Sequence, residues 1–290
     1  MHLPRRPRRR RRRRAARPPR PRARPRRRPR HRHPPARRPA GTRQRRPAPA
    51  RRPRPHPRHR RRRGRRGRAH HGRLIGQYPP MPHLDDAALE RSPVVANCVM
   101  NRERTLKGYV RELGIDVLAE ASGGHWLDLC CGTARALTEA AAADPRLKIT
   151  GIDLVGHFAP APPSVRLVTA SVTAWTPDDR ADLITCVHGL HYVGDKLGAL
   201  TRAASWLTEN GLLIANFDAR SVRLPDGSPA GRRLTTSLRQ AGFTYDPRRR
   251  RISIRGNRTI ELPYHYEGAD DRAGPNYTGQ PAVDSFYTPA

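Results

Sequence analysis

Five short apolar segments, alternating with segments of helical composition, constrain the fold of this chain more than any other feature. The apolar segments are residues 125–129, 148–153, 165–169, 182–187 and 211–217. Stretches rich in alanine, leucine or arginine lie at 134–143, 196–207 and 230–241. Strands that alternate with helices at this spacing form a parallel sheet with helices on its faces. The sequence therefore predicts an α/β fold with a Rossmann-like, doubly wound and mostly parallel sheet.

Three further segments complete the predicted architecture. The crossover between Asp153 and Val165 is rich in proline, so we expect a loop there rather than a helix. Residues 251–255 and 259–263 bracket Gly256-Asn257, a dipeptide typical of tight hairpin turns, which predicts an antiparallel C-terminal hairpin. The stretch 268–290, rich in Gly, Pro, Asp and Tyr, is expected to form an ordered loop or cap.

A helical lead-in is expected before the sheet. Apolar residues recur at three- and four-residue steps between Val94 and Leu113, as on one face of a helix. The predicted organisation is a disordered arginine- and proline-rich extension over 1–80, a lead-in over 81–122, the main domain over 123–267 and a cap over 268–290.

The net charge of +35 lies entirely in the extension. Residues 1–73 hold 35 Arg and no Lys, Asp or Glu, whereas the 24 basic residues from Leu74 onward face 24 acidic ones. A segment with almost no apolar side chains and strong self-repulsion cannot offset the entropy of ordering. We therefore expect the extension to be disordered and the domain to be neutral.

Three interpretations of the extension remain open. A dense run of arginine would bind phosphate by counterion release, although no aromatic residue that could stack on a base precedes Tyr78. A targeting segment would need an apolar or amphipathic stretch, and the extension has neither. Codons made of G and C specify Arg, Pro, Ala and Gly, so a translation start assigned upstream of Met81 would give the same composition. We favour this last interpretation, and the extension does not decide the function.

The cysteines and the hydropathy pattern suggest the compartment. Cys98, Cys130, Cys131 and Cys186 match no zinc-binding spacing, so we expect reduced thiols, no metal site and a cytoplasmic protein. No apolar run approaches the roughly 18 residues that a membrane span requires, so no membrane association is expected.

The segment WLDLCCGTARAL, which begins at Trp126, carries the chemistry. It has the pattern of a strand, a tight turn of small residues and a helix start, which lets a ligand approach free backbone N–H groups. Asp153 follows Gly132 by 21 residues, at the end of the next strand, where an acid can bind both hydroxyls of a ribose. Arg135 replaces the third glycine of dinucleotide sites, and Asp128 would repel a pyrophosphate. An adenosine-containing ligand with an ammonium group fits better.

The sequence LDLCCGTA resembles the first motif of class I S-adenosylmethionine-dependent methyltransferases. GIDL after residue 150, ASVTAW after 169, ADLITCVHGLHY after 180 and ASWLTENGLLIA after 203 extend the resemblance over roughly residues 95–265. The resemblance is to the small-molecule, bacterial type of this family. It implies an enzyme that uses S-adenosylmethionine as its cofactor.

The resemblance also implies roles for individual residues. The cofactor-binding residues would be Asp128, Cys130, Gly132 and Ala134 at the methionine part, Asp153 at the ribose, Leu154, Ser171 and Val172 around the adenine, and His188 after the fourth strand. Cys130 and Ala134 replace glycines of the family, which we expect to be tolerated only where φ is negative. Ser171 stands where many relatives have Asp, so the adenine contact is expected to be weaker or made by backbone.

Catalysis requires a base if the acceptor is a hydroxyl or a protonated amine. His191, in the loop after the fourth strand, is the candidate catalytic base, and a packing or cofactor-shell histidine is the alternative. An aromatic acceptor pocket is a further hypothesis, built from Tyr192, Tyr264, His265, Tyr266 and Tyr277.

A small-molecule acceptor, methylated on oxygen or nitrogen, is the expected partner. Where amine-directed nucleic-acid methyltransferases have an (Asp/Asn)-Pro-Pro-aromatic motif, this chain has HGLHY, and it lacks a Pro-Cys motif there. The neutral domain also has no obvious basic groove in its sequence. Two alternatives stay open: an RNA or other nucleic-acid methyltransferase that uses the arginine-rich arm, and a cofactor-binding module without catalysis.

Overall fold

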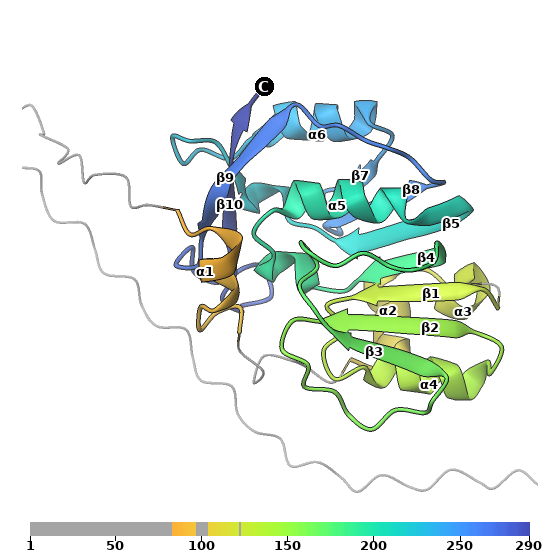
Figure 1. The fold of residues 1–290 in the computed structure, drawn as a ribbon. Helices are drawn as coiled ribbons and strands as arrows, with labels where there is room; N and C mark the ends of the chain where they lie inside the picture. The colour runs from red at the N-terminus through yellow and green to blue at the C-terminus, as the bar shows by residue number, and fades with distance from the viewer. Residues whose placement is uncertain (1–82, 97–103, 122) are drawn as a thin grey trace, which may run out of the picture. The chain divides into compact units, whose positions relative to one another are not determined.

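The computed structural model describes residues 83–96, 104–121 and 123–290, all within the compact unit Arg73–Ala290. Figure 1 shows the elements of this unit. The whole extension 1–80, for which we expect disorder, lies outside the described residues, as do Cys98 and Val99 of the predicted lead-in.

A seven-stranded sheet forms the centre of the unit, in the order β3-β2-β1-β4-β5-β8-β7. The five strands from β3 to β5 are parallel, and β8 runs antiparallel to both of its neighbours, β5 and β7. All five apolar segments form strands, which confirms the predicted fold class. The bounds are β1 His125–Leu129, β2 Lys148–Asp153, β3 Val165–Thr169, β4 Ala181–Cys186, β5 Leu207–Asn216, β7 Thr244–Asp246 and β8 Arg251–Arg255.

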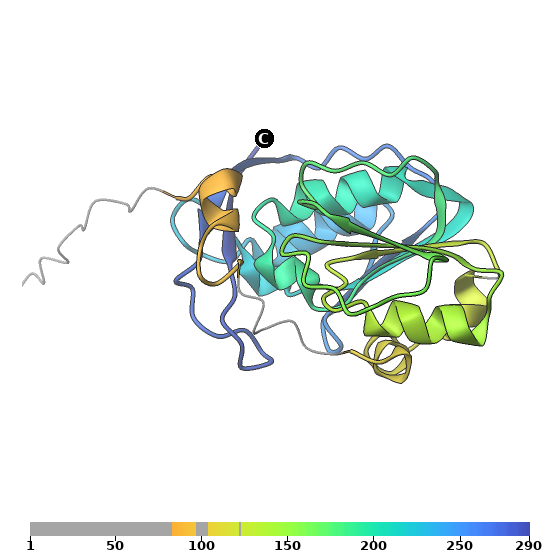
Figure 2. The ribbon, with the colours of Figure 1, turned by 60° about the horizontal axis from the view of Figure 1, so that its bottom comes forward.

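Helices cover both faces of this sheet, as Figure 2 shows. One apolar cluster joins helices α2, α3 and α4 to one face, and a second joins α5 and α6 to the other. Neighbouring strand residues alternate between the clusters, as the pleat requires: Trp126 enters the first and Leu127 the second. The bounds are α2 Leu106–Leu113, α3 Val117–Ala121, α4 Arg135–Ala143, α5 Lys196–Ser205 and α6 Gly231–Gln240.

Local signals set the ends of these helices. The Thr105 hydroxyl accepts a 3.1 Å hydrogen bond from the Gly108 N–H at the start of α2, and Gly114 ends the helix with φ of 66°. Asp195 caps α5 in the same way, through the Gly198 N–H at 2.9 Å. The described lead-in is helical as expected, but it consists of short helices, beginning with α1 Asp86–Glu90.

The crossover between β2 and β3 contains no helix, in agreement with its proline content. The hairpin prediction is wrong in its second strand. Residues 259–263 form no strand, and β8 pairs instead with β5 and β7. Gly256 donates through its N–H to the carbonyl of Gly211 at 2.9 Å, and the Asn257 amide donates to that of Leu207 at 3.0 Å. These bonds anchor the chain beside β5 instead of turning it back along β8.

The two ends of the stretch 268–290, expected to be an ordered loop or cap, lie in strands of a second sheet, and the residues between these strands form a loop. The order of this second sheet is β6-β10-β9, with β6 Val222–Arg223, β9 Tyr264–Asp270 and β10 Asp284–Pro289. The Tyr287 hydroxyl accepts from the Leu197 N–H at 3.0 Å and donates to Asp195 at 3.1 Å, which ties β10 to the start of α5. A backbone bridge between Leu84 and Ala269 then holds α1 beside β9, as both ribbon views show. Within the described residues, no helix is long and apolar enough to cross a membrane.

Candidate functional site

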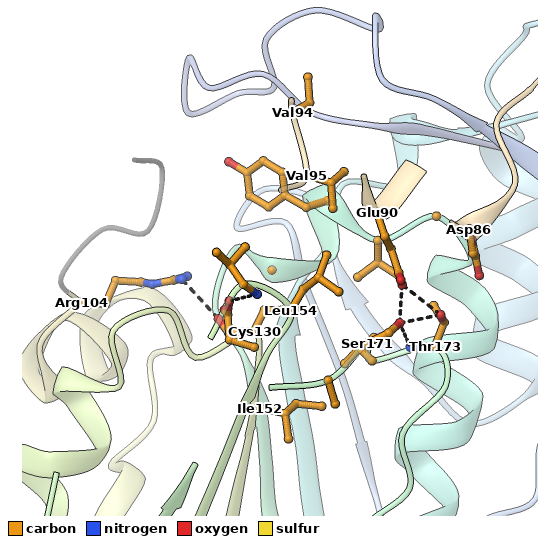
Figure 3. A pocket seen from close by; sticks show the side chains of 18 residues that line it. Asp86, Glu90, Val94, Val95, Arg104, Cys130, Ile152, Leu154, Ser171 and Thr173 are labelled. Atoms are coloured by element: carbon orange, nitrogen blue, oxygen red, sulfur yellow. Dashed lines mark hydrogen bonds between the residues drawn. The ribbon is translucent and has the colours of Figure 1, made fainter. Parts of the chain in front are cut away.

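The order of the parallel strands reverses between β1 and β4, so the loops at their carboxyl ends diverge and leave a crevice. A cavity lies there, and we call it the first cavity. Figure 3 shows its walls, which come from the loops after β1, β2, β3 and β4 and from α1 and the turn that follows it. Of the expected cofactor residues, its lining includes Cys130, Asp153, Leu154, Ser171 and Val172.

The turn after β1 has three left-handed residues: Cys130, Gly132 and Ala134 have φ of 58°, 60° and 62°. The condition expected for tolerance of the two non-glycine residues, a negative φ, is therefore not met. The Cys131 N–H donates to the Ile152 carbonyl at 2.9 Å, and this bond to β2 helps to hold the strained backbone. Gly132 and Ala134 shape the turn but do not line the first cavity.

Asp153 ends β2 on the wall of the first cavity and is 7% exposed. One carboxylate oxygen accepts from the Gly132 N–H at 2.9 Å, and the other from the Val155 N–H at 3.1 Å. These bonds fix the carboxylate in place while each oxygen keeps a further lone pair for a ligand.

Asp128 lies beneath the turn and does not line the first cavity. It is fully buried, and it accepts hydrogen bonds from the Tyr109 hydroxyl at 2.7 Å and from the Thr185 hydroxyl. Burial raises the pKa of Asp128 to about 6, although both hydrogen bonds oppose the rise. Its surroundings are those of a residue that supports the turn from inside.

Glu90 brings a carboxylate to Ser171, which stands where many relatives have Asp. The Ser171 hydroxyl donates to Glu90 Oε1, and Thr173 donates to the same oxygen at 3.4 Å. Figure 3 shows Glu90 descending from α1 to these hydroxyls. The sequence analysis missed Glu90, because α1 carries no motif and lies 81 residues before Ser171 in the chain.

Apolar side chains complete the first cavity. Ile152, Leu154 and Val172 come from the strand ends, and Val94 and Val95 come from the turn after α1. The lead-in pattern predicts the last two as helix residues. They lie in a turn instead.

Arg104 lies where the first cavity meets a second one. Its Nη2 donates to the Cys130 carbonyl at 3.3 Å, and its Nε is buried without a hydrogen-bond partner among the described residues. A buried guanidinium with an unsatisfied donor is a binding group for an anionic part of a ligand.

The second cavity is lined by Arg104, α2, the loop after β4 and the segment between β9 and β10. His188 is its central titratable group. Its Nε2 lies 3.6 Å from Glu112 Oε2, and its Nδ1 lies 3.5 Å from the Tyr277 hydroxyl. Expected as a cofactor residue, His188 lines this second cavity and not the first.

His191 lines neither cavity. It is 2% exposed, its ring packs edge-on to Tyr277 at 5.2 Å, and its Nε2 has no partner among the described residues. Burial, and then the nearby His188, lower the pKa of His191 to about 3. Of the five residues of the expected aromatic acceptor pocket, Tyr192 and Tyr277 line the second cavity and the other three do not.

A family model described as a methyltransferase domain matches residues 100–261. The chain belongs to this methyltransferase-domain family. The predicted class I S-adenosylmethionine-dependent methyltransferase is thereby confirmed as a family, together with the cofactor that such a domain implies.

Parts of the methyltransferase are similar to solved structures. One is coclaurine N-methyltransferase bound to N-methylheliamine and SAH, with 18% identity, a TM-score of 0.32, and coverage of 38% of this chain and 34% of that chain. Another is SAM-bound CalS10, an amino pentose methyltransferase from Micromonospora echinaspora. The identity is 19% and the TM-score 0.32, and the match covers 41% of this chain and 53% of that chain. A third is the sugar N-methyltransferase KedS8 from Streptoalloteichus, with 18% identity, a TM-score of 0.34, and coverage of 41% of this chain and 51% of that chain. This chain thus spans between a third and about half the length of these proteins. No curated protein matches it.

Two walls of the candidate site come from outside the matched region 100–261. Glu90 precedes this region, and Tyr277 follows it. The cover of the first cavity and part of the second are therefore contributed by segments that the family model does not include.

Proposed function

We propose that this methyltransferase transfers a methyl group from S-adenosylmethionine to an oxygen or nitrogen of a small-molecule acceptor. The observation that carries the proposal is the junction of the two cavities, which share Arg104 and Tyr192. A cofactor in the first cavity and an acceptor in the second would meet at these two residues. Such alignment of two reactants is the main contribution of a protein to a transfer reaction.

The donor set of the first cavity fits S-adenosylmethionine part by part. The fixed carboxylate of Asp153 would accept from the ribose hydroxyls. Leu154 and Val172 offer apolar contact to the adenine, and Glu90 an acceptor for its amino group. The unsatisfied Nε of Arg104 suits the carboxylate of the methionine part. In this proposal Asp128, Gly132 and Ala134 hold the shape of the turn, and Cys130 offers its backbone to the ligand.

The bound cofactor supplies an electrophilic methyl group on a sulfonium. His188 is the general base in this proposal, in place of His191. It lines the second cavity, and Glu112 stabilises the imidazolium that forms when His188 takes a proton from the acceptor. His191, with its pKa near 3, has little basicity for this task and instead packs behind Tyr277.

The mixed polar and aromatic lining of the second cavity supports a small acceptor. Its walls combine polar groups with the ring of Tyr277, a mixture that can position one polar molecule. Arg111 and Glu112, which also line it, form an ion pair at 3.5 Å.

Calorimetric titration of the full chain with S-adenosylmethionine and S-adenosylhomocysteine tests the cofactor part of the proposal. Micromolar binding of both is expected. A folded protein that binds neither would overturn it. Transfer of labelled methyl groups to a panel of phenols, alcohols and amines then tests the acceptor class, and transfer to RNA alone would contradict a small acceptor.

A further inference from the structure

An arginine groove lies between α6, the 3₁₀ turn η3 (Ala219–Ser221) and the turn from β7 to β8. Four arginines line it: Arg220, Arg232, Arg239 and Arg250. They lie 30 positions apart along the chain at the extremes, so the sequence, with its balanced charge, does not reveal them as a group. The groove is therefore not obvious in the neutral sequence, because only the fold brings these arginines together.

The positive charge of the arginine groove is largely uncompensated. Among the described residues that line it, Asp218 carries the one carboxylate. That carboxylate lies 3.8 Å from Arg250 and also accepts from the Arg220 backbone N–H at 3.1 Å. The side chains of Arg220, Arg232 and Arg239 are exposed, and none has an ion pair within the described part of the chain. Three guanidinium groups are thus available to a ligand.

The start of α6 adds to the positive potential of the arginine groove. Gly231 and Arg232, its first two residues, line the groove, and Ala230 before them provides no side-chain cap. No atom lies within 4 Å of the position that a Cβ of Gly231 would occupy. N–H groups at a helix start attract anions, and Arg232 in the same first turn strengthens that attraction, whereas Arg239 lines the groove from the last turn of α6.

A ring contact joins the arginine groove to the second cavity. The guanidinium carbon of Arg250 lies 4.1 Å from the ring centre of Tyr277. Arg250 lines the groove, and Tyr277 lines the second cavity beside His188. A ligand that spans this pair would place an anionic group among the arginines and a second group at the second cavity.

Phosphate is the anion that this arrangement suits best. Arginine binds phosphate through two parallel N–H bonds, and several such forks surround a tetrahedral anion. Binding of single-stranded RNA would also need exposed aromatic rings for stacking. Phe243 is 3% exposed, and the Tyr245 hydroxyl accepts from the Ala219 N–H at 3.4 Å in a half-buried setting. The groove therefore offers charge without a stacking surface.

We propose that the arginine groove binds the phosphate group of the methyl acceptor, which is a small phosphate ester. The role as acceptor rests on the proposed function, but the binding of phosphate by the groove does not. The two can therefore fail separately.

The test is site-resolved modification of arginine in the full chain, with phenylglyoxal as reagent and peptide mass spectrometry as readout. Pyrophosphate is the probe, and no cofactor is present. We expect pyrophosphate to slow modification of Arg220, Arg232 and Arg239 at least threefold. Arg146 and Arg166, exposed in ion pairs with Asp144 and Asp178, serve as controls and should react at unchanged rates. Because each peptide is read separately, binding by the arginine-rich extension does not obscure the result.

A matched pair of variants sharpens the test. Arg232→Gln with Arg239→Gln should raise the pyrophosphate concentration that half-protects Arg220 at least tenfold, and Arg146→Gln with Arg166→Gln should leave it unchanged. Equal protection of groove and control arginines would overturn the proposal. So would protection by a short single-stranded RNA when pyrophosphate gives none, because that result would assign the groove to nucleic acid.

Discussion

The backbone N–H of Gly132 donates a 2.9 Å hydrogen bond to Oδ2 of Asp153, and this bond ties the turn after β1 to the end of β2. The carboxylate proposed to meet the ribose thus also organises the turn that borders the cofactor. Binding and local stability are coupled at this one residue.

Replacement of Asp153 should therefore affect both properties. Asp153→Ala removes the acceptor of the Gly132 and Val155 N–H groups, so we expect the free energy of unfolding to fall by about 1–3 kcal/mol. Affinity for S-adenosylhomocysteine should fall at least about tenfold, as for a lost hydrogen bond to a charged group. Denaturant unfolding and calorimetry measure the two effects. The control Asp178→Ala removes an exposed carboxylate and should change neither; equal affinities in the two variants would contradict the role of Asp153.

Substitution of Glu90 should weaken binding of the adenine amino group. Glu90→Gln keeps the shape of the side chain but replaces one acceptor oxygen with a donor, so affinity for S-adenosylhomocysteine should fall by about tenfold. The analogue with a 6-oxo group in place of the amine should lose less affinity, because the new amide can donate to it. Titration of both ligands against wild type and variant gives this comparison. Equal losses for the two ligands would mean that Glu90 acts only through Ser171 and Thr173.

Substitutions of the two histidines after β4 should have different effects on kcat. His188→Gln is expected to lower kcat for a hydroxyl acceptor by a factor of about 100 or more, the usual contribution of a general base. His191→Gln should leave kcat within a few-fold of wild type, because His191 lines neither cavity. The pH profile of kcat should lose its acidic limb in the first variant alone. The reverse pattern would restore His191 as the base.

Ala134 should tolerate glycine, whereas Ala140 in the middle of α4 should not. With φ of 62°, Ala134 bears a left-handed conformation that costs a non-glycine residue about 1–2 kcal/mol. Ala134→Gly should therefore be at least as stable as wild type, since relief of strain offsets the lost methyl group and the added chain entropy. Ala140→Gly, a buried site in the middle of α4, should lose about 1 kcal/mol or more. Urea midpoints decide, and equal losses at both sites would contradict the strained turn.

Lys196 should make stability rise with pH above neutrality. It is buried, and its ammonium donates to the Val283 carbonyl at 2.8 Å and to Ser285 at 2.6 Å. Burial lowers its pKa from 10.5 to about 7, although Asp284 and Asp195 oppose this. The folded state thus disfavours the proton, so the contribution to stability is present above pH 10.5 and is lost as pH falls towards 7.

Unfolding curves between pH 7 and 9.5 measure this slope. Lys196→Met should remove the dependence due to this group, at some cost to the packing of β10. A variant that keeps the full wild-type slope would assign the dependence to other groups.

The strand ends of the candidate site could be predicted from the sequence because of simple geometry. Cys130, Asp153, Leu154 and Ser171 follow successive apolar segments, and the carboxyl ends of parallel strands meet at one edge of a sheet. Whether each side chain lines the cavity or is buried beneath it could not be predicted. Asp128 lies one residue before the end of β1, so the pleat turns it inward to Tyr109 and Thr185 instead of towards the first cavity.

Periodicity and turn composition thus specified the parallel strands and their helices, because these are local signals repeated along the chain. The family was indicated by the resemblance of LDLCCGTA to a family motif, which is also a local signal. Contacts between distant segments needed the folded chain. Glu90 reaches Ser171 because β9 holds α1 in place, Tyr277 reaches His188 from beyond the family's matched region, and three chain segments join in the arginine groove. None of these pairings has a spacing rule, since the intervening chain can be of any length once the sheet sets where its ends lie.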